Sequence, residues 1–160
     1  SKCNRYFFVE NPKEIKIENA PWQTAELKLH PDFKEKGLRK LKTKDRFYVA
    51  ENDFKEFKDG KLYRLMDCLN FRKEKKKLVF DSLQYEKYKK NGDKIIHWLP
   101  VQKDLVKVDV LMPNKEIKKG LAEPITRKLE VNDIVQFVRF GFCRLDSKKG
   151  DGLIFWFTHE

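Results

Sequence analysis

Apolar and polar residues alternate with a period of two along much of this chain, which is the pattern of half-buried β-strands. Ile15 and Ile17 alternate with charged residues, and Val106, Val108 and Val110 repeat the pattern later in the chain. No stretch carries the 3.6-residue repeat of a long amphipathic helix. Short strands are predicted at about ten places: 5–9, 14–18, 22–29, 46–50, 62–71, 78–85, 94–99, 106–110, 133–146 and 153–157. This spacing predicts an all-β, antiparallel fold, as one barrel or a pair of barrels.

The segments between these strands predict turns and one short helix. Asp59-Gly60 is a hairpin signal, and a glycine-bearing turn over 147–152 joins the last two strands into a hairpin. The lysine-rich segment 33–44 is interpreted as a basic loop, and 118–130 as an irregular stretch. Asp53 is expected to cap one helical turn.

The stretch 133–146, DIVQFVRFGFCRLD, is aromatic, β-prone and basic at once. Gln136, Arg139 and Arg144 stand between apolar residues, and Gly141 predicts a bend or a bulge. One interpretation is a core of phenylalanines with a solvated polar face. The other is that long polar donors recur on an apolar strand because they contact a ligand.

The composition of the chain indicates what kind of partner it binds. The chain has 160 residues, 40% of them hydrophobic, which is enough for a folded core in one domain or two very small ones. Its formal net charge is +11, which favours a polyanionic partner such as nucleic acid. The alternative is that the lysines only keep the protein soluble. No apolar run approaches the ~20 residues of a membrane span, and the first residues lack the features of a signal peptide.

Candidate chemistry is sparse. Cys3, Cys68 and Cys143 are widely scattered and odd in number, which indicates a reduced cytoplasmic protein without disulfides or a metal cluster. His97, between Ile96 and Trp98, is interpreted as structural. No nucleophile elbow, phosphate-binding glycine loop or zinc-protease helix motif is present. The residues alone therefore predict a binding module with no catalytic residue, no metal and no cofactor.

Eight ordered segments carry a resemblance that covers nearly the whole chain. They are RYFFV from Arg5, IENAP from Ile17, LHPDFKEKGLR from Leu29, DF from Asp53, YRL from Tyr63, IIHWLP from Ile95, KGLAEP from Lys119 and VQFVRFGFCRLD from Val135. In this order they resemble the C-terminal anticodon-binding region of glutamyl- and glutaminyl-tRNA synthetases, most closely that of the archaeal-type glutamyl enzyme.

The resemblance implies two small β-barrels in tandem that share strands and look like the barrel of an RNA-binding ribosomal protein. Residues 1–22 with 106–160 would form the barrel next to the catalytic domain, and 23–105 the distal barrel. The chain would be a non-catalytic fragment of a monomeric cytoplasmic glutamate–tRNA ligase. ATP and Mg²⁺ would be used in a catalytic domain absent from this chain. The partners implied are that domain and tRNA-Glu, with tRNA-Gln as a second candidate.

The resemblance also implies RNA-binding residues, namely Arg5, Arg64, Gln136 and Arg139. An arginine offers a planar fork of donors to a base edge or a phosphate, whereas glutamine offers both a donor and an acceptor. The alternatives are surface ion pairs for the arginines and a hydrogen bond within the barrel for Gln136. Sequence-independent phosphate attraction is expected from the lysines at 34, 36, 40, 42, 44, 73, 75, 76 and 77.

One segment departs from the family. Between Phe54 and Tyr63 the chain has only KEFKDGKL, where the bacterial glutaminyl enzyme has a longer segment with further anticodon contacts. This puts recognition of the third anticodon base in doubt, and many archaeal-type glutamyl enzymes charge both tRNAs. Two other classes stay open, a stand-alone ribosomal-protein-like RNA-binding barrel and a protein-interaction module.

Overall fold

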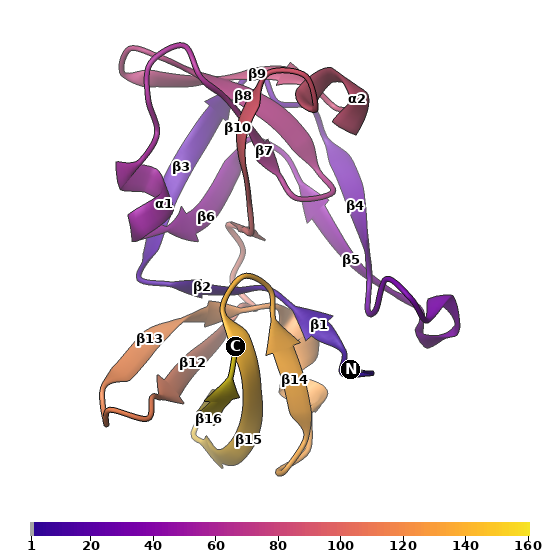
Figure 1. Ribbon diagram of the computed structural model, residues 1–160, viewed down its shortest axis with the longest axis vertical. Coiled ribbons are helices and arrows are strands. Elements are labelled where there is room, and N and C mark those ends of the chain that lie inside the picture. Colours follow the sequence, from indigo (N-terminus) through magenta and orange to yellow (C-terminus); the bar gives the residue numbers. More distant parts are fainter. Residues whose placement is uncertain (1) are drawn as a thin grey trace. The chain divides into compact units, whose positions relative to one another are not determined.

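The structure is a computed structural model that describes residues 2–160, and it divides into two compact units. Unit 1 comprises Ser1–Pro12, Lys28–Arg39 and Gln102–Glu160, and unit 2 comprises Lys13–Leu27 and Lys40–Val101. The described residues contain sixteen strands and four short helices, so the prediction of an all-β protein is confirmed (Figure 1).

Unit 1 is built on a seven-stranded sheet that nearly closes on itself. Its order is β1-β14-β15-β16-β12-β13-β2, so β1 and β2 are the two edges. Only Phe7 separates β1 from β2 along the chain, so the two edge strands are consecutive and the sheet must curl to bring them together (Figure 1). This closure leaves few backbone N–H and C=O groups unpaired at the edges. The bounds are β1 (Arg5–Tyr6), β2 (Phe8–Glu10), η1 (Lys34–Lys36), β12 (Val106–Leu111), β13 (Ile117–Ala122), η2 (Pro124–Lys128), β14 (Ile134–Phe137), β15 (Gly141–Lys149) and β16 (Gly152–His159).

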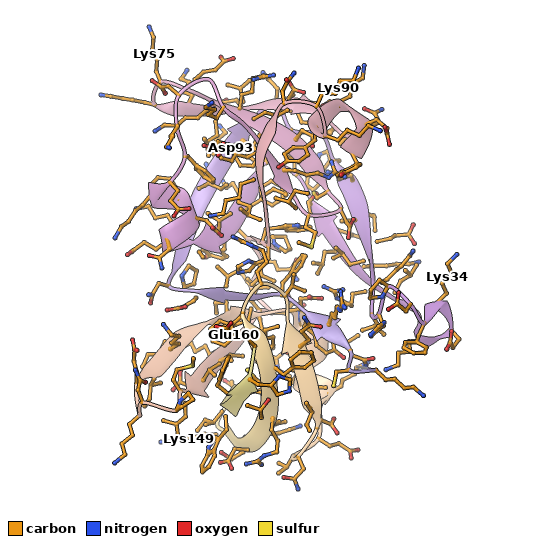
Figure 2. The ribbon with its side chains drawn as sticks, viewed as in Figure 1. Lys34, Lys75, Lys90, Asp93, Lys149 and Glu160 are labelled. Atoms are coloured by element: carbon orange, nitrogen blue, oxygen red, sulfur yellow. The ribbon has the colours of Figure 1, made fainter. Side chains whose placement is uncertain are left out.

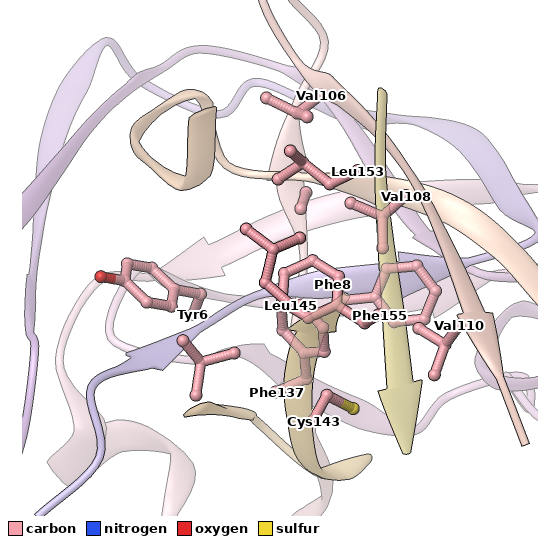
Figure 3. Packing of buried hydrophobic residues seen from close by; sticks show 12 residues of the cluster. Tyr6, Phe8, Val106, Val108, Val110, Phe137, Cys143, Leu145, Leu153 and Phe155 are labelled. Carbon is pink, nitrogen blue, oxygen red and sulfur yellow. The ribbon is translucent and has the colours of Figure 1, made fainter. Parts of the chain in front are cut away.

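Aromatic side chains fill the core of unit 1 (Figure 3). The Phe137 ring packs 5.2 Å from the Phe8 ring and 4.9 Å from the Phe155 ring, measured between centroids. Each such side chain stabilises the fold by about 1.5–3 kcal/mol when fully buried. The buried cluster is Tyr6, Phe8, Val106, Val108, Val110, Ala122, Val135, Phe137, Cys143, Leu145, Leu153 and Phe155.

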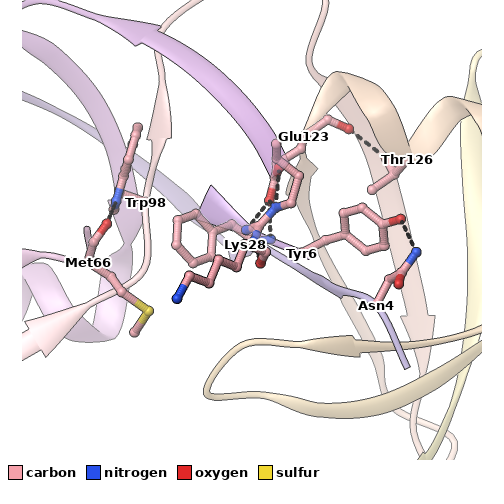
Figure 4. A network of polar contacts seen from close by, with 9 residues as sticks. Asn4, Tyr6, Lys28, Met66, Trp98, Glu123 and Thr126 are labelled. Carbon is pink, nitrogen blue, oxygen red and sulfur yellow. Dashed lines mark hydrogen bonds and ion pairs between the residues drawn. The ribbon is translucent and has the colours of Figure 1, made fainter. Parts of the chain in front are cut away.

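Unit 2 repeats the same closure in a second seven-stranded sheet, ordered β10-β7-β8-β9-β3-β6-β11. Its edges β10 and β11 are separated only by His97 and Trp98. The Trp98 indole is buried, and its N–H donates to the Met66 carbonyl at 2.9 Å (Figure 4). The bounds are β3 (Pro12–Glu18), β6 (Arg46–Ala50), α1 (Glu51–Lys55), β7 (Leu62–Leu65), β8 (Leu69–Glu74), β9 (Lys77–Ser82), α2 (Tyr85–Tyr88), β10 (Gly92–Ile96) and β11 (Leu99–Pro100). A separate two-stranded ribbon consists of β4 (Gln23–Lys28) and β5 (Leu38–Thr43).

Strand pairing is mixed rather than wholly antiparallel. The pairs β1–β14, β12–β16, β7–β10 and β3–β9 are parallel. Parallel neighbours require a long connection, whereas hairpins join antiparallel ones. In both sheets the parallel partners come from distant segments of the chain, so no local turn signal announced them.

The prediction of a basic loop over 33–44 was wrong, because this segment contains η1 and strand β5. In β5, Arg39, Leu41 and Thr43 are buried and alternate with exposed residues. The alternation was hidden because Arg39 counts as polar in a sequence pattern. Its burial depends on a partner 84 residues away.

That partner is Glu123, and the pair links all three segments of unit 1 (Figure 4). Arg39 Nη2 lies 2.8 Å from Glu123 Oε2, and Arg39 Nη1 donates to the Lys28 carbonyl at 2.7 Å. The backbone N–H of Phe7 donates to Glu123 Oε2 at 2.6 Å. Both side chains are almost fully buried, so each charge depends on the other.

Asp53 is not a helix cap. Helix α1 begins after Ala50, which makes no side-chain capping bond, and Asp53 lies inside the helix. Its buried carboxylate instead forms an ion pair with Lys94 at 2.9 Å. Phe57 is buried, whereas Phe54 is partly exposed.

Three further segments differ from the predicted elements. The stretch 62–71 is not one strand but parts of β7 and β8, joined by a turn in which Asp67 has a positive φ of 56°. Likewise 133–146 contains β14 and the first part of β15. The chain turns before Gly141, whereas the sequence predicted a bend at Gly141 within one strand. Tyr85–Tyr88 is a short helix, and strand β13 occupies part of the stretch that was interpreted as irregular.

Candidate nucleic-acid interface

Arg5 and Gln136 lie directly beside each other in the sheet of unit 1. Strands β1 and β14 are parallel, with Arg5 opposite Gln136 and Tyr6 opposite Phe137. The Gln136 N–H donates to the Asn4 carbonyl at 2.9 Å, which holds the two strands in this register. Because side chains alternate across a strand and Tyr6 and Phe137 are in the core, Arg5 and Gln136 face outward together.

The row continues across the next two strands. Gln136 is paired with Phe142 of β15, and Phe142 is paired with His159 of β16. The Phe142 and His159 rings are stacked, with centroids 4.6 Å apart and planes 28° apart. Residues paired across neighbouring strands project to the same side, so an arginine, a glutamine and two stacked rings share one surface. Sequence reasoning missed this stack because its two members belong to different strands.

Arg5 has an unusual hydrogen-bonding state. Its Nε is buried and makes no hydrogen bond within residues 2–160. A buried N–H without a partner costs roughly 1–3 kcal/mol, more where the group is charged, so such groups are rare in folded proteins. Its backbone N–H, in contrast, donates to the Leu29 carbonyl at 2.8 Å. The backbone of Arg5 is fixed, and its guanidinium carries a buried donor that no described residue satisfies.

Arg139 occupies the tight turn between β14 and β15. It is exposed and has a positive φ of 64°, a left-handed conformation that costs an ordinary residue roughly 1–2 kcal/mol. The turn is closed by the Phe140 N–H, which donates to the Phe137 carbonyl at 2.9 Å. The hairpin thus displays the Arg139 side chain at its tip, three residues beyond Gln136.

Arg64 belongs to unit 2 and is buried in a polar network. Its Nη1 donates to Asn70 Oδ1 and to the Leu83 carbonyl, both at 2.9 Å. Asn70 in turn donates to Ser82 and Gln84. Burial lowers the pKa of the Arg64 guanidinium from its usual value. The Arg64 guanidinium is thus held by Asn70 and Leu83, and the half-exposed Tyr85 ring lies 5.9 Å from its guanidinium carbon.

Lysines supply a dispersed positive surface. Lys34, Lys75, Lys90 and Lys149 point away from the ribbon in Figure 2. Of the lysines that the sequence selected, Lys73 is different, because it is partly buried and its Nζ donates to the Phe57 carbonyl at 3.3 Å. Exposed lysines of this kind attract phosphates without reading sequence.

The structure also bears on the chemistry that the sequence could not find. Within residues 2–160, no group of three or more histidine, cysteine, aspartate or glutamate side chains could hold a metal ion. Burial raises the pKa of the Cys68 and Cys143 thiols to about 12, so neither is a thiolate at neutral pH. Among the described helices, none combines the length and apolar character required to cross a membrane.

Comparison with protein families shows the class of domain to which this chain belongs. Residues 3–88 and 95–146 match two models, both described as the anti-codon binding domain of class I tRNA synthetases (E and Q). The chain therefore belongs to the family of anticodon-binding domains of these synthetases.

Individual relatives are similar over nearly the whole chain. A glutamate–tRNA ligase of Methanocaldococcus jannaschii is 45% identical, that of Pyrococcus horikoshii 40% and that of Methanobrevibacter smithii 38%, each over 99% of this chain. The chain spans 28–29% of the length of these relatives.

Proposed function

We propose that this chain reads the tRNA anticodon for a glutamate–tRNA ligase whose catalytic domain lies in the same polypeptide. The observation that carries the proposal is the outward-facing row of Arg5, Gln136, Phe142 and His159 on a domain of the anticodon-binding family. The glutamate specificity is supported by the three archaeal relatives, all of which are glutamate–tRNA ligases. The formal charge of +11 fits a polyanionic partner.

The catalytic domain and this chain would have different roles in the parent enzyme. We propose that ATP and Mg²⁺ act in the catalytic domain and that this chain contributes binding and orientation. The parent enzyme would be a monomer that works in the cytoplasm. The barrel that contains 106–160 would adjoin the catalytic domain, with the other barrel distal to it.

The proposed reading uses the complementary chemistry of the row. Anticodon bases must be unstacked before their edges can be read, and aromatic rings can then stack against them. Gln136 offers one donor group and one acceptor to a base edge, while the Arg5 guanidinium offers donors only. Arg139 at the hairpin tip would reach a phosphate or a neighbouring base. Arg64 would act from unit 2, where Asn70 and Leu83 hold its guanidinium in one orientation.

A salt titration tests the proposal. The chain is expected to bind a tRNA-Glu transcript weakly and to lose affinity steeply with salt, because lysine–phosphate contacts dominate. The log–log slope for single strands is roughly −0.7 per neutralised phosphate. Six contacts would give a slope of about −4 and a loss of about 300-fold between 50 and 200 mM salt.

Filter binding across that salt range measures the slope. Affinity that stays flat with salt would contradict RNA binding and would support a protein-interaction module. Equal binding of a tRNA-Glu transcript and one with a scrambled anticodon loop would instead contradict anticodon reading while leaving general RNA binding intact.

We also propose that the parent enzyme accepts both tRNA-Glu and tRNA-Gln. The two anticodons differ in the third base, and the short segment between Phe54 and Tyr63 offers no dedicated reader for it. A site without donors or acceptors aimed at a base discriminates poorly, because no buried polar group is left unpaired by the wrong base.

In the full-length enzyme, changing only the third anticodon base of tRNA-Glu from C to G is expected to alter kcat/KM by less than about tenfold, or ~1.4 kcal/mol. Steady-state aminoacylation of the two transcripts measures this. A loss of a hundredfold or more would show that another residue reads the third base.

A further inference from the structure

Trp22 is displayed to solvent on an ordered segment of unit 2. Its side chain is 75% exposed, whereas Trp98 is fully buried. The residues on both sides are fixed, since the Ala20 N–H donates to the Ile17 carbonyl and the Gln23 amide lies 3.2 Å from Cys68 Sγ. An indole in water loses the burial free energy that usually fixes an aromatic residue in a fold.

A row of lysines extends from Trp22 along the ribbon. Lys44 Nζ lies 5.6 Å from the centroid of the Trp22 ring, a cation–π distance. Lys40 and Lys42 are exposed on strand β5, on the face opposite its buried residues. Lys40 and Lys42 are alternate residues of the strand, about 7 Å apart along the backbone, and Lys44 directly follows its last residue, Thr43. Within residues 2–160, no ion pair engages Lys40 or Lys42.

We propose that this face of the β4–β5 ribbon binds single-stranded RNA, with Trp22 stacking on an unpaired base and Lys40, Lys42 and Lys44 contacting phosphates. A positively charged track with an aromatic platform is the combination that single-stranded nucleic acid requires, because each nucleotide presents both a charge and a π-face. The inference rests on the proposed function, with tRNA as the partner, and adds a contact surface on unit 2. It accounts for lysines that the anticodon-reading row does not use.

The chain offers a matched control for Trp22. Trp156 is 45% exposed and also carries a cation, with the Arg144 guanidinium carbon 5.5 Å from its ring centroid. Its strand neighbour Leu111 is apolar, and Arg144 is itself near Asp146. The lysines of the two paired strands, Lys107 in β12 and Lys148 and Lys149 in β15, lie four or more residues from Leu111 and Arg144, with Asp109 and Asp146 between them. If Trp22 stacks on RNA, its replacement should weaken RNA binding and replacement of Trp156 should not. If only surface hydrophobicity matters, the two replacements should have equal effects.

The experiment measures binding of a tRNA-Glu transcript across a salt series. Trp22→Ala is expected to weaken binding about 5- to 100-fold with an unchanged salt slope, the size of one lost stacking contact. Trp22→Phe should retain most of the affinity, and Trp156→Ala should leave it unchanged. Lys40→Gln and Lys42→Gln should each reduce the slope by about 0.7. The melting temperature of Trp22→Ala should match that of the wild type, because the exposed side chain contributes little to packing.

The outcomes separate this inference from the proposed function. Salt-dependent binding of the wild type with unaltered affinity in Trp22→Ala overturns the ribbon surface alone. Equal losses in Trp22→Ala and Trp156→Ala overturn it as well. Absence of salt-dependent tRNA binding by the wild type overturns the proposed function, and the ribbon surface with it.

Discussion

Replacing Glu123 by alanine is expected to lower the free energy of unfolding by about 3–5 kcal/mol, the cost of removing one partner from a buried ion pair. Arg39 would be left charged at a position where its side chain is only 4% exposed in the intact protein. The Phe7 N–H would lose its acceptor as well. Urea unfolding of the variant, compared at equal m-value, measures the change.

Two controls show whether burial is the cause. Glu14→Ala breaks the exposed Arg46–Glu14 pair, whose N–O distance of 3.0 Å is close to that of the buried pair, and should cost below about 1 kcal/mol. Joint replacement of Arg39 by methionine and Glu123 by leucine should recover much of the lost stability, because no charge stays uncompensated. A Glu123→Ala cost no larger than that of Glu14→Ala would refute the role of the pair.

Gly120→Ala is expected to destabilise unit 1 by about 3 kcal/mol, the upper end for an overpacked site. Gly120 in β13 lies opposite Glu10 of β2. A Cβ at this position would be 2.0 Å from the Val9 carbonyl oxygen, which belongs to the backbone and cannot rotate away. The substitution therefore has to push β13 and β2 apart, at the point where the sheet closes.

Gly150→Ala is the matched control in the same unit. A Cβ there meets no atom within 4 Å, but the backbone has a positive φ of 58°. Its cost should therefore be only the conformational one, about 1 kcal/mol. Thermal unfolding of both variants tests this, and equal costs would show that β2 and β13 can relax around a methyl group.

The sequence predicted elements well where the alternation was local. Strands at 14–18, 46–50 and 106–110 coincide with β3, β6 and β12 within one or two residues. In β5 the same alternation was present but concealed, because Arg39 is polar by type and buried by virtue of Glu123. A pattern of residue types cannot anticipate a charge whose burial depends on a distant partner.

The candidate site also contains one strand pairing that is local in the sequence and one that joins distant segments. The pairing of Gln136 with Phe142 follows from one hairpin and would have been found if the turn at 138–140 had been placed before Gly141. The pairing of Arg5 with Gln136 joins the two ends of the chain in parallel, and no turn residue specifies it. Arg64 was selected from the family resemblance, as the arginine of the YRL segment, and only its contacts with Asn70 and Leu83 show that the fold holds it.

The bent segment that closes the sheet of unit 1 has a consequence for how the protein is made. Phe7 and its acceptor Glu123 are 116 residues apart, and synthesis proceeds at about 5–20 residues per second. Phe8 and Val9 would therefore wait roughly 6–25 s for their partners in β13 to leave the ribosome. All the strands of the seven-stranded sheet of unit 2 are complete before residue 102 and can pair during that interval. Phe8 and Val9 are thus covered late, after the whole sheet of unit 2 has been synthesised, and a nascent chain exposes them during that interval.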